Sequence, residues 1–325
     1  MKGEKMQSYK IYVTDNIADD AVNLLKEKGF DAISGETLPE TQLAEAIGEY
    51  DAIAIRSATK ITPAVLENPG KLKLVVRGGV GIDNIDVAAA TAKNVAVANT
   101  PGANTIATAE LAFGLMLALS RNIATGYASL SSGEWNRKAF RGVELYGKTL
   151  GLLGFGRIGR EFASRAQAFG MHVVAYDPYL PESVFTESGV KQVALDVLWP
   201  AADFISLHLP ATAETKNIIN AETIAQMKDG VRLINAARGT LLDDVAVAAA
   251  IDSGKIAGVA LDVYPTEPPA SDFALLNKPG VLHVPHLGAS SFEAQDKVAS
   301  EVADVIIEFL EQKTGSSVVN LKEIS

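Results

Sequence analysis

The stretch Lys148 to Pro178, KTLGLLGFGRIGREFASRAQAFGMHVVAYDP, constrains the fold more than any other part of the chain. An apolar run from Thr149 to Leu153 has the length of a strand and leads directly into Gly154-Phe155-Gly156-Arg157-Ile158-Gly159. A helical pattern of apolar residues follows, and a second apolar run, Met171 to Tyr176, ends at Asp177. A strand, glycine turn, helix and strand within about thirty residues predict one βαβ unit.

Each glycine of this turn has a physical role if the unit binds a dinucleotide. Gly154 permits the tight turn, Gly156 lets the backbone approach a pyrophosphate, and Gly159 allows close packing of helix on strand. The amides and dipole at the helix N-terminus attract the phosphates. Asp177 can accept hydrogen bonds from the adenosine ribose and repels a 2′-phosphate. The context predicts NAD rather than NADP, although such turns also occur in loops that bind no ligand.

The composition excludes several other functions. The chain has 29 Lys and Arg against 39 Asp and Glu, and its net charge of −10 argues against binding nucleic acid or anionic membranes. It has no cysteine, which excludes disulfides, thiol nucleophiles and Cys-ligated metals, and no metal site is expected. The polar start lacks a secretory signal and the longest apolar helix is too short for a bilayer, so a cytoplasmic protein is expected.

The N-terminal hundred residues alternate expected strands and helices. Such alternation predicts a parallel sheet with helices on both faces, and the fold class is α/β with two doubly wound parallel sheets. The expected strands are 11–13, 52–55, 72–76 and 95–98, and the expected helices are 18–28, 40–47 and 86–92.

Two loops of this region carry unusual residues directly after strands. They are Arg56-Ser57 and Arg77-Gly78-Gly79-Val80-Gly81. Ligands of open parallel sheets lie beyond the carboxyl ends of the strands. The glycine-rich backbone can form an anion nest, and Arg56 can grip a carboxylate or phosphate. A plainer interpretation stays open, in which the glycines only make turns and Arg56 is a surface residue.

A long helix is expected at about 105–130, with Asn104 as its N-cap, connecting two domains. Its apolar face would pack in a core or in a subunit interface. The segment Trp135-Asn136-Arg137-Lys138-Ala139-Phe140-Arg141 follows and is the densest basic cluster of the chain. It is either a solvated turn or part of a site for an anionic substrate.

Further strands are expected at 203–208, 231–235, 257–263 and 281–284, and a chemically active residue lies at or after the end of each. These residues are His208, Arg238, Glu267 and His286. Because such strand ends converge in space, a buried Arg, Glu and His there indicate a catalytic constellation.

Histidine suits the exchange of a proton with an alcohol while hydride moves to or from NAD, because its ordinary pKa lies near neutrality. His208 and His286 are both candidates, whereas His172 and His283 lie within expected strands and should pack in the core. Glu267 would fix the tautomer of the catalytic histidine, and Arg238 would clamp a 2-oxo acid. Two structural roles stay open. Arg238 could simply pair with Glu267, and His286 could cap the helix beginning near residue 290.

Motifs along nearly the whole chain resemble the D-isomer-specific 2-hydroxyacid dehydrogenases, and most closely the phosphoglycerate dehydrogenase branch in a short form without a regulatory domain. The resemblance implies a Rossmann NAD-binding domain, 102–290, inserted in a flavodoxin-like substrate-binding domain, 1–101 and 291–325. The motifs are Ile55-Arg56-Ser57-Ala58-Thr59-Lys60, Gly81-Ile82-Asp83-Asn84-Ile85-Asp86, the turn at 154–159, 235–239, Ala260-Leu261-Asp262-Val263, Glu267-Pro268-Pro269 and 285–291.

The same resemblance implies a set of site residues. The catalytic set is Arg238, Glu267 and His286, with His286 the proton donor. The residues expected to hold NAD are Val80, Gly154, Gly156, Arg157, Ile158, Gly159, Asp177, Leu209, Ala236, Asp262 and Gly288. Those expected at the substrate are Arg56, Ser57, Gly78, Gly79, Asn104 and Arg137.

The implied substrate is a 2-hydroxy or 2-oxo acid, and the implied reaction is NAD-dependent oxidation of D-3-phosphoglycerate to 3-phosphohydroxypyruvate, the first step of serine synthesis. A homodimer is expected through the long helix and the segment around Trp135, from which Arg137, Lys138 or Arg141 would reach the phosphate in the partner. The alternatives are a glyoxylate or hydroxypyruvate reductase, another D-2-hydroxyacid dehydrogenase, or a transcriptional corepressor that senses NAD and shares the fold.

Overall fold

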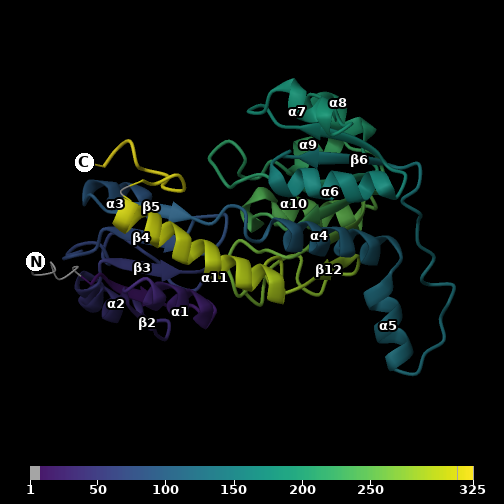
Figure 1. Cartoon of the computed structure of the whole chain (residues 1–325). Helices are drawn as coiled ribbons and strands as arrows, with labels where there is room; N and C mark the ends of the chain where they lie inside the picture. The colour runs from purple at the N-terminus through teal and green to yellow at the C-terminus, as the bar shows by residue number, and fades with distance from the viewer. Residues whose placement is uncertain (1–7, 313, 325) are drawn as a thin grey trace, which may run out of the picture. The chain divides into compact units, whose positions relative to one another are not determined.

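The computed structural model describes residues 8–312 and 314–324, and its internal contacts divide the chain into two units. The first unit is 1–104 with 289–325, and the second is 105–288. Each unit has its own sheet, and all strand pairs within both sheets are parallel (Figure 1). This confirms the predicted α/β class with two parallel sheets.

The first unit has five strands in the order β2-β1-β3-β4-β5, the flavodoxin-like order. The strands are β1 (Lys10–Val13), β2 (Asp31–Ser34), β3 (Ala52–Ile55), β4 (Leu74–Arg77) and β5 (Ala96–Asn99). The helices are α1 (Asp19–Glu27), α2 (Glu40–Ala46), α3 (Val87–Ala92) and α11 (Phe292–Ile307), with a 3-10 turn at Ile47–Glu49 and a π-helical stretch at Glu308–Gln312.

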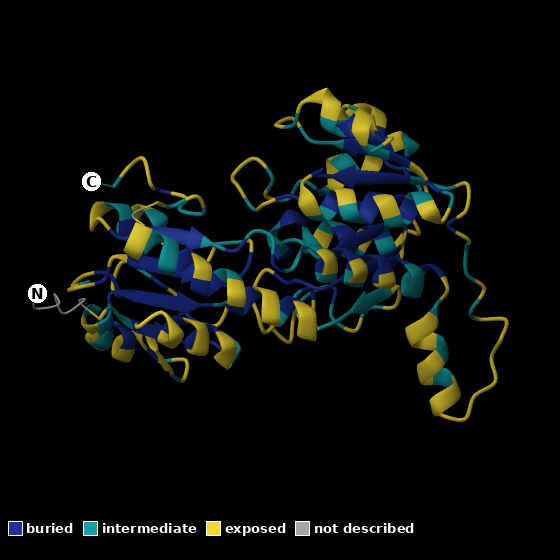
Figure 2. Cartoon of the chain, viewed as in Figure 1, coloured by how far each residue is buried: buried dark blue, intermediate teal, exposed yellow. Residues whose placement is uncertain are grey.

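Alternation of side chains along each strand decides which helices cover which face of this sheet. In β3, Ala52 and Ala54 face the core formed with α1 and α11, whereas Ile53 and Ile55 face the core formed with α2 and α3. Figure 2 shows the strands as a buried layer, with exposed residues on the outer sides of the helices. Both faces of the strands are therefore apolar, as in other covered parallel sheets.

The second unit has seven strands in the order β12-β11-β10-β9-β6-β7-β8, which reverses between β6 and β9 as in a Rossmann sheet. The strands are β6 (Thr149–Leu153), β7 (His172–Tyr176), β8 (Lys191–Gln192), β9 (Phe204–Leu207), β10 (Val231–Asn235), β11 (Ile256–Leu261) and β12 (Val281–His283). The helices are α4 (Thr105–Ser120), α5 (Ile123–Ser131), α6 (Arg157–Ala168), α7 (Glu182–Glu187), α8 (Leu195–Ala201), α9 (Ala221–Gln226) and α10 (Asp244–Asp252), with a 3-10 turn at Gly239–Leu241.

The single helix expected at 105–130 is wrong, because the chain forms α4 and α5 with a bend of 63°. Asn122 lies in the break with a left-handed φ of +54°. The carbonyl of Ser120 accepts a hydrogen bond from the amide of Val143 at 2.9 Å. In a continuous helix that carbonyl would accept a hydrogen bond from the amide of Ala124. Here it accepts from Val143 instead, so the helix does not continue through residue 124.

Other local expectations also need correction. Asn104 does not cap α4, because its Oδ1 is buried and accepts no hydrogen bond. The C-terminal α-helix, for which a start near residue 290 is expected, runs from Phe292 to Ile307. The Oγ of Ser291 caps α11 by accepting a hydrogen bond from Ala294, so His286 is not the cap.

Within the described part of the chain, no single helix is long and apolar enough to cross a membrane. The bent pair α4 and α5 meets those limits only when the two helices are counted together.

Candidate active site

The carboxyl ends of the parallel strands bring predicted residues of the second unit to one edge of its sheet. β6 leads to Gly154, β7 to Asp177, β10 to Arg238, β11 to Asp262 and β12 to His286. This edge, at the point where the strand order reverses, is where open α/β sheets bind ligands.

The glycine turn has the geometry expected for a phosphate-binding backbone. Gly154 has φ +92°, and a Cβ there would lie 2.6 Å from the carbonyl oxygen of His208. A Cβ at Gly159 would lie 2.6 Å from the carbonyl oxygen of Gly154, whereas one at Gly156 would meet no atom within 4 Å. Helix α6 begins at Arg157 with no side-chain cap and no acidic residue in its first turn. Open backbone, uncapped amides and a cation fit a pyrophosphate.

Asp177 holds the glycine turn through a hydrogen bond to a backbone amide. Its Oδ2 accepts a hydrogen bond from the amide of Phe155 at 2.9 Å, and its Oδ1 accepts one from the amide of Tyr179 at 3.1 Å. An ionised carboxylate has about four acceptor sites, so about two remain for ribose hydroxyls. Asp177 therefore also holds the turn, a role that the sequence did not suggest.

Glu267 and His286 form a close titratable pair. Oε2 of Glu267 lies 2.6 Å from Nδ1 of His286, and Oε1 accepts a hydrogen bond from the amide of Tyr264 at 3.2 Å. The side chains of Glu267 and His286 are 34% and 39% exposed, so this pair is open to solvent in the structure, not buried as expected. Burial raises the pKa of Glu267, but the hydrogen bond and charge of His286 outweigh it, and the pKa lies below its ordinary value. A charged Glu267 on Nδ1 leaves Nε2 of His286 for proton exchange with a substrate.

Arg238 lies in a braced turn after β10. The buried Asn235 donates through Nδ2 to the carbonyl oxygen of Arg238 at 2.9 Å and accepts at Oδ1 from the amide of Ala237 at 3.1 Å. The positive charge of Arg238 helps to lower the pKa of Glu267, so the two side chains interact electrostatically. The guanidinium fork suits the carboxylate of a 2-oxo acid.

Two further residues brace the backbone around His286, which has a left-handed φ of +53°. The carboxylate of Asp262 is fully buried and accepts hydrogen bonds from the amides of residues 287 and 288, at 2.5 and 2.9 Å. The hydroxyl of Tyr264 donates to the carbonyl oxygen of Val284 at 2.8 Å. Burial raises the pKa of Asp262, and burial raises the pKa of Tyr264 to about 12. These bonds offset the strain of the left-handed residue.

The structure separates the four histidines. Nε2 of His208 lies 3.0 Å from Oγ of Ser206, the ring packs against Phe162, and burial lowers the pKa of His208 to about 4. A packed, neutral ring favours His286 over His208 as proton donor. His172 is exposed, contrary to the expected core position, because it begins β7 at the surface. His283 is partly buried, and its Nδ1 has no hydrogen-bond partner.

We expect His208 to destabilise the folded protein in acid. Its folded pKa of about 4 lies below the ordinary 6.5, so the unfolded chain binds the proton more readily, and stability is lost as the pH falls from about 6.5 towards 4. Because the residue is partly exposed, we expect a loss of about 1–2 kcal/mol. Unfolding of the wild type and of His208→Asn at several pH values should show the smaller acid effect in the variant. Equal effects would contradict this origin.

The first unit brings Arg56 and the predicted glycines together. The amide of Gly78 donates to the carbonyl oxygen of Ile55 at 2.8 Å, and a Cβ at Gly78 would lie 3.6 Å from Cγ of Arg56. Gly79 has φ +143°, and Arg56 is half-buried whereas Ser57 is exposed. The glycines therefore make turns, and these turns lie beside Arg56.

The remaining predicted residues differ in exposure, and Arg137 lies in a turn after α5 in the second unit. Exposed are Arg137, Val80 and Arg157, partly buried are Ile158, Ala236 and Asn104, and buried are Leu209 and Gly288. Among the described residues, no three His, Asp or Glu side chains are grouped as metal ligands.

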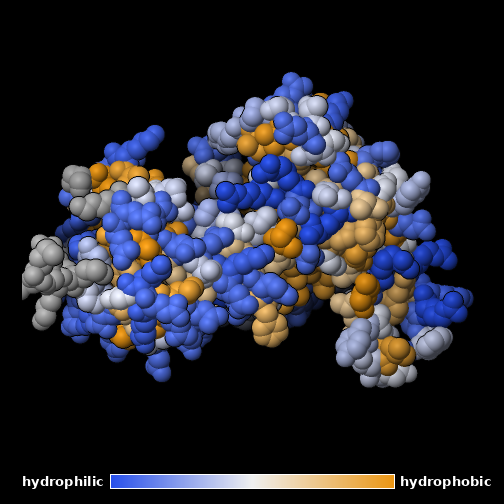
Figure 3. All heavy atoms as spheres, viewed as in Figure 1, coloured by the Kyte–Doolittle hydropathy of each residue, from blue (hydrophilic) through white to orange (hydrophobic). Residues whose placement is uncertain are grey.

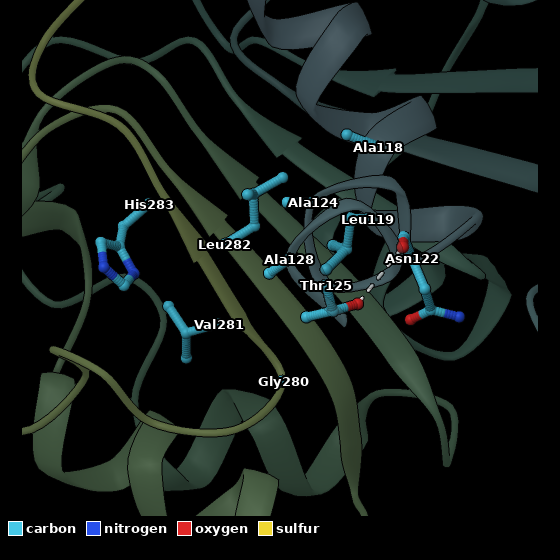
Figure 4. Close-up of a pocket in the computed structure, with 10 residues that line it drawn as sticks. All are labelled: Ala118, Leu119, Asn122, Ala124, Thr125, Ala128, Gly280, Val281, Leu282 and His283. Atoms are coloured by element: carbon cyan, nitrogen blue, oxygen red, sulfur yellow. Dashed lines mark hydrogen bonds between the residues drawn. The ribbon is translucent and has the colours of Figure 1, made fainter. Parts of the chain in front are cut away.

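A cavity of about 330 Å³ lies elsewhere in the second unit. It is lined by residues of α4, α5 and the break between them and by residues in and next to β12, namely Ala118, Leu119, Asn122, Ala124, Thr125, Ala128, Gly280, Val281, Leu282 and His283 (Figure 4). None of the predicted catalytic or cofactor-binding residues lines this cavity, so its size is not evidence for the site.

Comparison with known proteins identifies the family. The model of the D-isomer specific 2-hydroxyacid dehydrogenase, NAD binding domain, matches residues 113–288, more than half of the chain. The chain belongs to this family. A D-3-phosphoglycerate dehydrogenase of Methanocaldococcus jannaschii is 47% identical over 97% of the chain, and the chain spans 60% of that relative's length. A hydroxypyruvate reductase of Thermotoga maritima is 46% identical over 94% of the chain and 99% of its own length.

A solved structure supports the same relation. The glyoxylate reductase from Paecilomyes thermophila matches with a TM-score of 0.88 and 34% identity, over 98% of this chain and 100% of that chain. The likeness covers both units of the fold.

Two residues that support predicted site residues were missed in the sequence. Asp15 closely follows β1 and Tyr264 closely follows β11. The same rule of polar residues after strand ends would have identified both.

Proposed function

We propose that the protein is an NAD-dependent oxidoreductase that interconverts D-2-hydroxy acids and 2-oxo acids. The observation that carries the proposal is the Glu267–His286 pair, 2.6 Å apart, at the same sheet edge as the uncapped glycine turn. The turn at 154–159, Arg157 and Asp177 would hold NAD, which supplies the acceptor or donor of hydride when bound.

The residues of the chain divide the remaining work. Arg238 binds the substrate carboxylate and orients the reacting carbon. In the reductive direction, Nε2 of His286 donates a proton to the carbonyl oxygen, and in the oxidative direction it accepts the hydroxyl proton. Glu267 keeps Nδ1 of His286 protonated and oriented, and its charge stabilises the imidazolium.

For the substrate we propose D-3-phosphoglycerate, oxidised to 3-phosphohydroxypyruvate as the first step of serine synthesis, in the cytoplasm. The names of several relatives that are 40–47% identical support this assignment. The exposed cations Arg137, Lys138 and Arg141 supply the charge that a phosphate needs. A hydroxypyruvate reductase is the second candidate, because a relative of that name is 46% identical to the chain, nearly as similar as the phosphoglycerate dehydrogenase of Methanocaldococcus jannaschii.

The reaction type is tested by isotope transfer. NADH deuterated at the transferable position of the nicotinamide is incubated with the protein and 3-phosphohydroxypyruvate. Deuterium at C2 of a product with D configuration is the expected result. The absence of NADH oxidation with this acid, hydroxypyruvate and glyoxylate would contradict the proposed reaction.

We also propose that the protein acts as a homodimer joined through α5. No residue of α5 is buried, and Ile123, Tyr127, Leu130 and the nearby Trp135 are exposed, Tyr127 to 75%. Figure 3 shows hydrophobic atoms at the surface of this helix. Large apolar side chains left exposed on one helix favour a partner surface, and a second copy is the simplest partner.

Loss of positive charge from the basic cluster should lower the catalytic efficiency with phosphorylated substrates more than with unphosphorylated ones. We expect Arg137→Ala with Lys138→Ala to lower kcat/KM for 3-phosphohydroxypyruvate by about 10-fold, the scale of one charge-assisted hydrogen bond, and to change the value for glyoxylate much less. Lys26→Ala with Lys28→Ala, on the exposed end of α1, removes the same charge as a control. An equal loss of kcat/KM for both acids would contradict a role of the basic cluster in binding the substrate phosphate.

A further inference from the structure

We propose that Asp15 is a positioning residue for the substrate loop, defined as residues 56–59, and that it holds this loop in the shape in which Arg56 receives an anionic group of the substrate. The proposal rests on the proposed function, together with the expectation from the family resemblance that Arg56 lies at the substrate. It adds a residue that contacts the loop and not the reacting atoms.

The carboxylate of Asp15 is saturated by groups of the substrate loop and its neighbour. Oδ2 accepts hydrogen bonds from the amides of Arg56 and Thr59, at 2.8 and 2.9 Å. Oδ1 accepts hydrogen bonds from the hydroxyls of Thr59 and Thr37, at 2.6 and 2.7 Å. All four partners are donors, so the ionised carboxylate is the form that fits. Asp15 is only 7% exposed, and its removal would leave amides of the loop without a partner.

The backbone directs this carboxylate at the loop. β1 lies beside β3 in the sheet, so the chain leaving β1 meets the chain leaving β3. Asp15 and Asn16 both adopt left-handed φ angles, +58° and +55°. Asp and Asn tolerate this region better than other residues, but two in succession are costly. The hydrogen bonds of Asp15 offset that cost.

Asn84 holds the same loop from its carbonyl side. Its Nδ2 donates to the carbonyl oxygens of Arg56 and Thr59, at 2.7 and 2.6 Å. Asp15 therefore binds the amides and Asn84 the carbonyls of the same two residues. These bonds use only backbone atoms of Arg56, so its guanidinium is not consumed by them.

Asp51, in the same unit, is a matched control that distinguishes a positioning role of Asp15 from a purely structural one. Asp51 is also 7% exposed and also binds a backbone amide, that of Lys10 at 3.0 Å, together with Nζ of Lys73 at 2.9 Å. It precedes β3, at the end of the strand opposite to the substrate loop. Asp51→Asn should therefore lower stability without reaching the substrate.

The test compares Asp15→Asn, Asn84→Ala and Asp51→Asn in the full chain, with kcat and separate KM values for the 2-oxo acid and NADH. In Asp15→Asn an amide donor faces the amides of the loop, and we expect the KM for the acid to rise about 10-fold or more, with the KM for NADH unchanged. Asn84→Ala should likewise raise the KM for the acid and leave the KM for NADH unchanged. It provides the test if Asp15→Asn does not fold. Asp51→Asn should lower the Tm and leave both KM values near the wild type.

An unchanged KM for the acid in Asp15→Asn and Asn84→Ala, or an equal rise for acid and NADH, would overturn the positioning role. The acid is chosen as the better of 3-phosphohydroxypyruvate and hydroxypyruvate for the wild type. A wild type that prefers the unphosphorylated acid, with the expected response of Asp15→Asn, removes the phosphoglycerate assignment and supports the positioning role. A wild type that turns over neither acid overturns both proposals.

Discussion

Replacement of His286 by alanine is expected to lower kcat by about 10²- to 10⁴-fold, the range for loss of a general acid–base. Nδ1 of His286 lies 2.6 Å from Glu267, so Nε2 is the nitrogen left to exchange a proton with the substrate. The KM for NADH should change little, because the glycine turn and Asp177 remain. Steady-state rates in both directions measure the effect.

Two other variants locate the cause of that loss. Glu267→Gln keeps a hydrogen-bond acceptor and removes the charge, so we expect a loss in the same direction and smaller than that of His286→Ala. His208→Asn should retain most activity, because the ring of His208 is packed against Phe162 and neutral near pH 7. A larger loss in His208→Asn than in His286→Ala would transfer the proton role to His208.

Replacement of Asp177 by alanine is expected to reduce the preference for NAD over NADP by about 1–3 kcal/mol, the scale of hydrogen bonds to a charged group. Loss of the carboxylate is expected to remove two effects: the repulsion of a 2′-phosphate, which sets the preference, and the hydrogen bond that holds the amide of Phe155 at 2.9 Å, which supports the binding of either cofactor. The ratio of kcat/KM for NADH and NADPH measures the preference. A variant that excludes NADPH as strongly as the wild type would show that Asp177 does not face the ribose.

Asp177→Asn separates the two contributions. The amide oxygen can still accept from Phe155, but the charge is lost. We expect the discrimination against NADPH to fall as in Asp177→Ala, while the KM for NADH rises less. Similar KM values in both variants would mean that the bond to the turn does not matter for cofactor binding.

The parts of the fold that the sequence predicted are those set by local pattern. The sequence predicts strand, glycine turn, helix and strand at 149–177, because the apolar periodicity and the glycine that adopts a positive φ at 154 lie within about thirty residues. The flavodoxin-like and Rossmann sheets followed from family resemblance, and the strand orders confirm them.

The parts that could not be predicted depend on contacts between distant segments. The apolar pattern continues through the break at Asn122. The helix ends there because the carbonyl oxygen of Ser120 accepts a hydrogen bond from the amide of Val143 rather than from a residue of the next turn. The hydrogen bond from the amide of Thr59 to the carboxylate of Asp15 joins residues 44 positions apart. Periodicity within a segment carries no information about such a partner.

The candidate site shows the same division. Glycine types and strand ends identified where a ligand would bind. The residue pattern left His208 and His286 as alternatives, and only the family resemblance favoured His286. That choice depends on the burial of one ring and on the 2.6 Å contact of the other with Glu267, which is 19 positions away. Whether the predicted contacts to NAD and substrate form stays a prediction.

The measurement that tests the proposed activity most directly is NADH oxidation by the purified protein with 3-phosphohydroxypyruvate, hydroxypyruvate and glyoxylate at matched concentrations. We expect kcat/KM for the phosphorylated acid to exceed the other two by about 10-fold or more, because the phosphate adds charge-assisted hydrogen bonds. A preference for hydroxypyruvate or glyoxylate would contradict the phosphoglycerate assignment and favour a hydroxypyruvate reductase with the same catalytic pair.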